Sequence, residues 1–306
     1  LGLEYLRCRD ILALREESAA FYEALVQTVS GQIQAAQSAP AETAPLEEQT
    51  GESLEDAGQS DESQADGEQA DEAQAGEEAA GAAQTERLQA DLETAQAALA
   101  SAQLAVEEAQ ADLQAATDAL NTALGNPIGT FLEVTDTLTA QALPALTADR
   151  AARQALEGRN EIRQAAYEVE RAEQTLNQLR YEYAPDSPEI LEQQAVLQQA
   201  QGAYSQTVSQ VEAGVRDSLT RLELQSRQLE QRAATLEQAG TSAPQTDYAL
   251  QSGTDGTWSS NLSQLVEQWT QTESGRAALI EEIARFNLDV ICFQHAVGAG
   301  CVAAEI

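Results

Sequence analysis

The sequence has few of the side chains that fill a compact core or carry out catalysis. Its 306 residues include no Met, two Trp and one His, and aromatic residues make up 4% of the chain. A globular domain of this length needs bulky apolar side chains in its interior. We therefore expect long, thin helical packing and not a globular enzyme.

Lysine is also absent. The 16 basic residues are all Arg and stand against 51 acidic residues, which gives a formal net charge of −35. Such a charge repels a phosphate backbone, so we expect no nucleic-acid partner, and it disfavours an anionic membrane surface. No apolar run reaches the roughly 18 residues that a membrane-spanning helix requires. The chain begins at Leu1, so we expect it to be incomplete at its N-terminus, with membrane association only indirect or through the missing part.

Cysteine and histidine give no sign of a reactive or metal-binding site. Cys8, Cys292 and Cys301 are odd in number and lack CxxC spacing, which predicts neither a disulfide framework nor a zinc site. His295 is best interpreted as a helix-surface residue near the Cys292 thiol, in preference to a nucleophile pair. We predict no catalytic, cofactor-binding or metal-binding residues, and hence no enzyme.

Residues 38–84 differ abruptly in composition from the rest of the chain. They contain fourteen acidic residues, no Arg and almost nothing beyond Ala, Glu, Gln, Gly, Ser and Asp. Low hydrophobicity and charge of one sign favour disorder, because too little apolar area is available to offset the entropy of ordering the backbone. We predict a disordered acidic linker, either a solvated tether or an interaction segment.

A seven-residue apolar period governs most of the remaining sequence. In the first such segment one row consists of Leu92, Leu99, Val106, Leu113 and Leu120, and the other of Ala95, Ala102, Ala109, Ala116 and Ala123. Three further segments begin at Ile162, Leu197 and Leu262, and residues 3–36 form another amphipathic stretch. The pattern predicts an all-α protein of long antiparallel coiled-coil hairpins.

Glycine and proline mark the ends of these helices. Gly125 suits a left-handed helix C-cap, Pro188 suits a first helical turn, and residues 240–260 contain Pro244, Gly253 and Gly256. The predicted first repeat consists of a helix at 1–37, the linker at 38–84 and a closing helix at 85–125. An inter-repeat loop follows at 126–148, with a short extended piece at 131–134. The predicted second repeat consists of helical hairpins at 149–300.

An internal repeat relates the first and the last heptad segments. An offset of 173 residues places Leu92 on Leu265, Val106 on Leu279 and Gly125 on Gly298. The period alone would align any two heptad segments, but a terminal glycine in the same register favours two structural repeats.

The residues at this junction resemble those of a known family. Asp118 to Leu179 is similar to the junction between the two halves of the outer-membrane efflux proteins, the TolC-like tunnel family. The positions that match are Leu120, Leu124, Gly125, Pro127, Leu132, Ala155, Leu156 and Arg159. Asn287 to Gly298 resembles the closing helix of that family, and the likeness covers residues 1–37 and 85–300.

The resemblance implies a cell-envelope, extracytoplasmic protein that acts as a conduit or docking component of an efflux or export system. It implies self-association, with a trimer as the family's state, and a periplasmic or extracytoplasmic adaptor as partner. The hairpin tip implied by the resemblance contributes the contact residues Tyr248, Leu250, Gly253 and Ser259.

One departure from the family pattern is clear. In the family each half inserts a pair of transmembrane strands between its two long helices, and each strand takes about 9–11 residues. Here only residues 184–187 join the second-half helices. The fold expected is therefore TolC-like without a complete β-barrel. The alternative function is a non-transporting extracytoplasmic coiled-coil spacer or scaffold.

Overall fold

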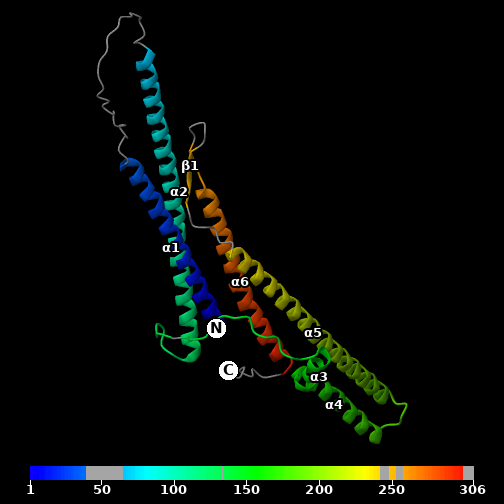
Figure 1. The fold of residues 1–306 in the computed structure, drawn as a ribbon. Coiled ribbons are helices and arrows are strands. Elements are labelled where there is room, and N and C mark those ends of the chain that lie inside the picture. The colour runs from blue at the N-terminus through cyan, green and yellow to red at the C-terminus, as the bar shows by residue number, and fades with distance from the viewer. Residues whose placement is uncertain (39–64, 133, 242–247, 253–257, 299–306) are drawn as a thin grey trace, which may run out of the picture. The chain divides into compact units, whose positions relative to one another are not determined.

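The computed structural model describes residues 1–38, 65–132, 134–241, 248–252 and 258–298 (Figure 1). These residues form six helices and two short strands, which confirms the prediction of a mostly helical protein. The elements are α1 (Gly2–Ser38), α2 (Ala65–Leu124), α3 (Ala148–Gly158), α4 (Asn160–Glu182), α5 (Pro188–Thr241), β1 (Leu250–Ser252), β2 (Trp258–Ser260) and α6 (Leu262–Ala296). Within this described part of the chain, no helix is both long and apolar enough to span a membrane.

The chain divides into two compact units. Unit 1 comprises Leu1–Arg7, Ala119–Gln238 and Ala278–Ile306, and unit 2 comprises Cys8–Asp118 and Ala239–Ala277. Helices α1, α2, α5 and α6 each contribute residues to both units.

The core of unit 2 lies between α1, α2 and the first turns of α6. Its buried members are Tyr22, Leu25, Val29, Leu88, Ala95, Ala102, Tyr248, Leu262 and Leu265. On α2 the Ala row of the heptad pattern is the more deeply buried one, since Ala95 is fully buried while Leu92 and Leu99 are only partly buried. Small side chains on this face permit a close approach of the neighbouring helices.

The core of unit 1 joins α3, α4, α5 and the second half of α6. Its buried members are Ala151, Ala155, Ile162, Val211, Val215, Leu219, Leu222, Leu229, Phe286, Val290, Phe293 and Val297. In α5 the residues Val215, Leu222 and Leu229 keep the predicted spacing of seven. The buried side of this helix therefore follows its heptad pattern.

The predicted helix ends are confirmed at several positions. Gly125 has a φ of 76° directly after α2, and Gly298 has a φ of 79° just after α6. In both cases the glycine N–H donates to the carbonyl three residues earlier, Thr122 at 3.1 Å and His295 at 3.0 Å. Pro188 is the first residue of α5, as expected for a residue whose missing N–H costs nothing there.

Three features differ from the sequence-based expectations. Helix α2 begins at Ala65, so residues 65–84 are helical where disorder was predicted, while 39–64 lie outside the described residues. The abundant Ala, Glu and Gln of 65–84 have high helix propensity, which the hydrophobicity argument ignored. Two differences were not anticipated: Arg159 separates α3 from α4, and a strand pair precedes α6.

Candidate partner-contact site

The four residues predicted at the hairpin tip do not share one environment. Tyr248 is buried in the unit 2 core, Leu250 is partly buried against it, and Ser259 is exposed. Gly253 lies outside the described residues. The strands β1 and β2 are antiparallel and pair Leu250 with Ser260, Gln251 with Ser259, and Ser252 with Trp258.

Asn261 connects this strand pair to the start of α6. Its Oδ1 accepts a hydrogen bond from the Ala249 N–H at 2.8 Å, and its own N–H donates to the Ala249 carbonyl at 3.2 Å. Its carbonyl in turn accepts from the Leu265 N–H at 3.0 Å. Asn261 thus lies directly before α6, and it orients the strands relative to this helix.

A buried carboxylate anchors the strand pair to α2. Asp91 is 3% exposed, and its Oδ2 accepts from the Tyr248 hydroxyl at 2.7 Å. The Arg87 guanidinium lies 3.2 Å from Asp91 Oδ1 and donates to the Ser260 hydroxyl at 3.0 Å. Because Asp91 has both a phenol donor and a cation, its burial in an apolar core is compensated.

Burial raises the pKa of Tyr248, and the Asp91 carboxylate that accepts its hydrogen bond raises this pKa further. The tyrosine is therefore a neutral hydrogen-bond donor to Asp91. Trp258 adds another anchor, since its indole N–H donates to the Ala80 carbonyl of α2 at 3.0 Å. These contacts have a structural role.

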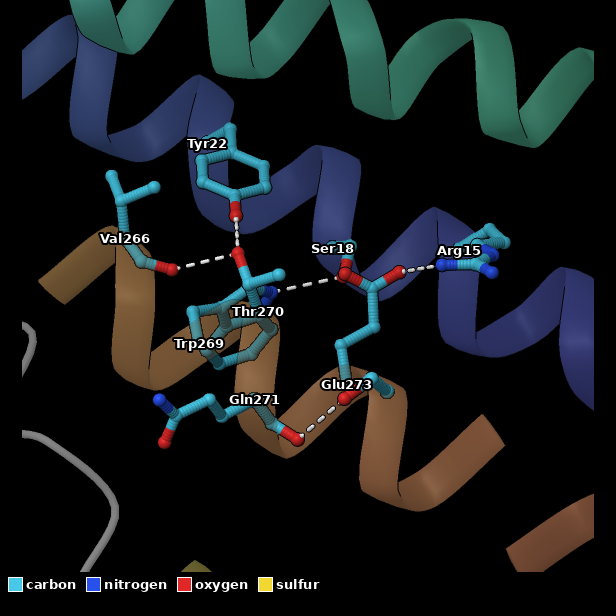
Figure 2. A network of polar contacts seen from close by, with 9 residues as sticks. Arg15, Ser18, Tyr22, Val266, Trp269, Thr270, Gln271 and Glu273 are labelled. Atoms are coloured by element: carbon cyan, nitrogen blue, oxygen red, sulfur yellow. Dashed lines mark hydrogen bonds and ion pairs between the residues drawn. The ribbon is translucent and has the colours of Figure 1, made fainter. Parts of the chain in front are cut away.

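Figure 2 shows a second polar network, between α1 and α6 in unit 2. The Trp269 indole N–H donates to the Ser18 hydroxyl at 2.9 Å, Tyr22 and Thr270 share a hydrogen bond at 3.2 Å, and Arg15 pairs with Glu273. The Trp269 ring stacks on Phe21 with centroids 4.1 Å apart and planes 7° from parallel. Trp269 thus anchors one helix on the other.

Sequence reasoning missed Asp91, Ser18 and their partners. A signal was present for Asp91, because it lies three residues after Leu88 and four before Ala95, and these helical spacings place it on the buried face. A charged residue on an apolar face predicts a buried partner. The partner could not be identified, because Tyr248 follows 157 residues later.

The described residues of the site present small and amide side chains at the surface. Of the paired strand residues, Gln251, Ser252 and Ser259 are exposed, while the charged and aromatic groups around them are bonded within the unit. The described residues hold no group of His, Cys, Asp or Glu arranged for a metal ion. Cys8 is buried and Cys292 is exposed.

In unit 1, two buried asparagines hold the connection between α2 and α3. Asn121 donates from Nδ2 to the Thr130 carbonyl at 2.8 Å. Asn287 donates from Nδ2 to the Thr139 carbonyl and accepts at Oδ1 from the Gln141 N–H, both at 2.8 Å. This connection is consequently fixed on the helices at two points although it has no regular secondary structure.

The C-terminal end of α6 contacts the junction of α3 and α4. The Arg159 Nε donates to the Ala296 carbonyl at 2.7 Å. A Cβ placed on Gly298 would lie 3.4 Å from the Gly158 Cα, so the two backbones approach closely. His295 lies in the last turn of α6 and is exposed, as predicted for it.

No family model matches this chain, and no curated protein is similar to it.

Proposed function

We propose that the chain is a helical component of an extracytoplasmic export assembly, which packs against further copies of itself and docks an adaptor protein. The resemblance to the TolC-like family and three features of the described residues support this function.

The observation that carries the proposal is an uncharged, largely exposed run on α5. Gln193 to Val211 contains no charged residue, although 22% of the chain is charged. Val196 is 45% exposed and Tyr204 is 37% exposed, and the side chains between them are mostly small or amide-bearing. Copies with a charge of −35 repel one another, so a second copy packs most favourably where charge is absent.

The helix ends support the repeat on which the resemblance depends. Gly125 and Gly298 correspond under the offset of 173 residues, and both take a left-handed conformation that terminates a helix. The two glycines also share the same hydrogen bond to the third preceding carbonyl. The two segments therefore correspond in the backbone conformation at this glycine as well as in their sequence.

The strand pair is the proposed adaptor contact. Its exposed residues, Gln251, Ser252 and Ser259, are held by the Asn261 and Asp91 anchors, so they present a surface of fixed shape. A pre-ordered surface loses little entropy when a partner helix binds it.

A non-transporting spacer or scaffold is the second candidate. One observation favours it: α4 and α5 are joined by residues 183–187 alone, with a hydrogen bond from Ser187 N–H to the Ala184 carbonyl at 3.0 Å. No inserted segment separates these two helices. A spacer of this kind functions as a single copy.

Sedimentation of charge variants tests the proposal. Val196→Glu introduces a carboxylate into the uncharged run of α5, and we expect it to weaken self-association at least about tenfold, because every added copy buries the charge. Gln231→Glu adds the same charge to an exposed position of α5 outside this run and should leave association unchanged. Equal effects of both substitutions, or no association of the unmodified chain, would refute packing through this surface.

A further inference from the structure

A groove in unit 1 has the size and lining of a small-molecule site. It lies between residues 140–143 of the α2–α3 connection, α5 and α6, and has a volume of about 470 Å³. Leu143, Leu229, Leu279 and Ile283 provide its apolar surface. Ligand sites in proteins typically measure about 300–1,000 Å³ and are mostly apolar with a few polar groups.

The groove is pre-formed because its wall is held in place. Asn287, 2% exposed, binds the Thr139 carbonyl and the Gln141 N–H with the two ends of its amide, each at 2.8 Å. Both bonds lie at the segment that forms one side of the groove. A ligand would therefore enter without the entropic cost of first ordering this wall.

The polar lining selects for positive charge. Glu230 lines the groove from α5 and is exposed. The ion pairs between described residues do not include Glu230, while nearby Arg232 is paired with Glu282 at 2.6 Å. The other polar side chains of the lining, Gln141 and Ser226, are neutral. With a net charge of −35, the protein attracts cations and repels anions at this opening.

We propose that this groove binds a small apolar cation. Its hydrocarbon or aromatic body lies against Leu143, Leu279 and Ile283, and its ammonium group lies beside the Glu230 carboxylate. The apolar surface supplies most of the affinity, since an exposed ion pair contributes little in comparison. The site is independent of the self-association surface on α5.

Calorimetric titration of the full chain with three naphthalene compounds of the same shape tests this site. The compounds are naphthylmethylammonium, naphthylmethanol and naphthoate, substituted at the same ring carbon, in a buffer of about 0.15 M ionic strength to screen distant charges. We expect the ammonium compound to bind about two- to fivefold more tightly than the alcohol, and the anionic naphthoate to bind most weakly. Glu230→Gln should reduce the affinity for the ammonium compound to that for the alcohol.

Two matched pairs of variants locate the binding. Ala233→Trp fills the groove from α5 and should abolish binding of both the ammonium compound and the alcohol, whereas Ala234→Trp, at the next exposed position and outside the lining, should leave both unchanged. Glu237→Gln removes the same charge as Glu230→Gln farther along α5 and should have no effect. Circular dichroism of each variant shows whether it remains folded.

Three results would overturn the proposal: no binding by the unmodified chain, undiminished binding by a folded Ala233→Trp variant, or equal loss with Glu230→Gln and Glu237→Gln. The last result would mean that the net charge of the protein, and not the groove, attracts the cation.

Discussion

Asp91 illustrates how single polar residues determine the packing of unit 2. Its carboxylate accepts a hydrogen bond from the Tyr248 hydroxyl and pairs with the Arg87 guanidinium, in a core made of aliphatic and aromatic side chains. An apolar residue at this position would pack as well but would specify no partner. The hydrogen bonds therefore fix which surface of α2 receives the strand pair.

Removing the Tyr248 hydroxyl should destabilise unit 2. Tyr248→Phe leaves a buried carboxylate oxygen without its donor, and we expect the free energy of unfolding to fall by about 1–3 kcal/mol. Urea unfolding followed by circular dichroism measures the change. Tyr204→Phe removes an exposed hydroxyl from α5 and should change it by less than about 0.5 kcal/mol. Equal effects of the two substitutions would contradict the anchoring role of Asp91.

The same tyrosine should make stability fall in alkaline solution. Its folded-state pKa is raised by burial and by Asp91, so its contribution is fully present below the ordinary tyrosine pKa of about 10. Above that pH the unfolded chain releases this proton while the folded chain retains it, and the free energy of unfolding decreases. Between about pH 8 and pH 11 the decrease should be larger for the unmodified chain than for Tyr248→Phe. Parallel curves for the two proteins would contradict the proton linkage.

Two glycines should respond to alanine in opposite directions. Gly298 has a φ of 79° and faces the Gly158 backbone, so Gly298→Ala should destabilise unit 1 by about 1–2 kcal/mol. Gly202 lies inside α5 with open space around it, so Gly202→Ala should stabilise by about 0.5–1 kcal/mol. Thermal unfolding of both variants tests the difference in sign, and a stabilising Gly298→Ala would contradict the left-handed cap.

At the scale of elements, the connection between α2 and α3 has no regular secondary structure. Asparagine side chains therefore hold its backbone in place of a regular series of backbone hydrogen bonds. Asn287→Ala removes the bonds to Thr139 and Gln141, and we expect amide exchange at Gln141 to accelerate at least about tenfold. Exchange measured by mass spectrometry or NMR would show this. Asn177→Ala, on the exposed face of α4, is the control and should not alter exchange at Gln141.

The helices and the strands differ in how far the sequence predicts them. Helices α1 and α5 are predicted by the seven-residue apolar period and by the Gly and Pro residues at helix ends, since both signals are local. The strands β1 and β2 are three residues each and are held by Asn261 and by contacts to α2, which no local pattern reveals. The start of α2 was misjudged because composition indicated disorder while propensity favoured a helix.

The candidate site shows the same limit. Tyr248 and Ser259 were selected through a resemblance, but the sequence could not indicate that one is buried and the other exposed. The groove beside Glu230 was not predicted either, because its lining comes from three segments that lie far apart in the chain.

At the scale of the whole molecule, net charge opposes the proposed assembly. Copies that each carry −35 repel one another, and salt screens this repulsion over a Debye length of about 10 Å at 0.1 M. We expect self-association to strengthen as the salt concentration rises from about 0.05 M to 0.5 M, because the proposed contact surface on α5 is uncharged. Sedimentation at several salt concentrations measures the trend, and weaker association in high salt would point to contacts made by ion pairs.

The most direct test of the proposed function is the mass of the purified chain in solution, measured by light scattering over a range of concentrations together with its helix content by circular dichroism. The account predicts a mostly helical assembly of several copies, with a trimer expected from the family resemblance. A mostly helical monomer at every concentration would contradict self-assembly and leave the spacer or scaffold as the function.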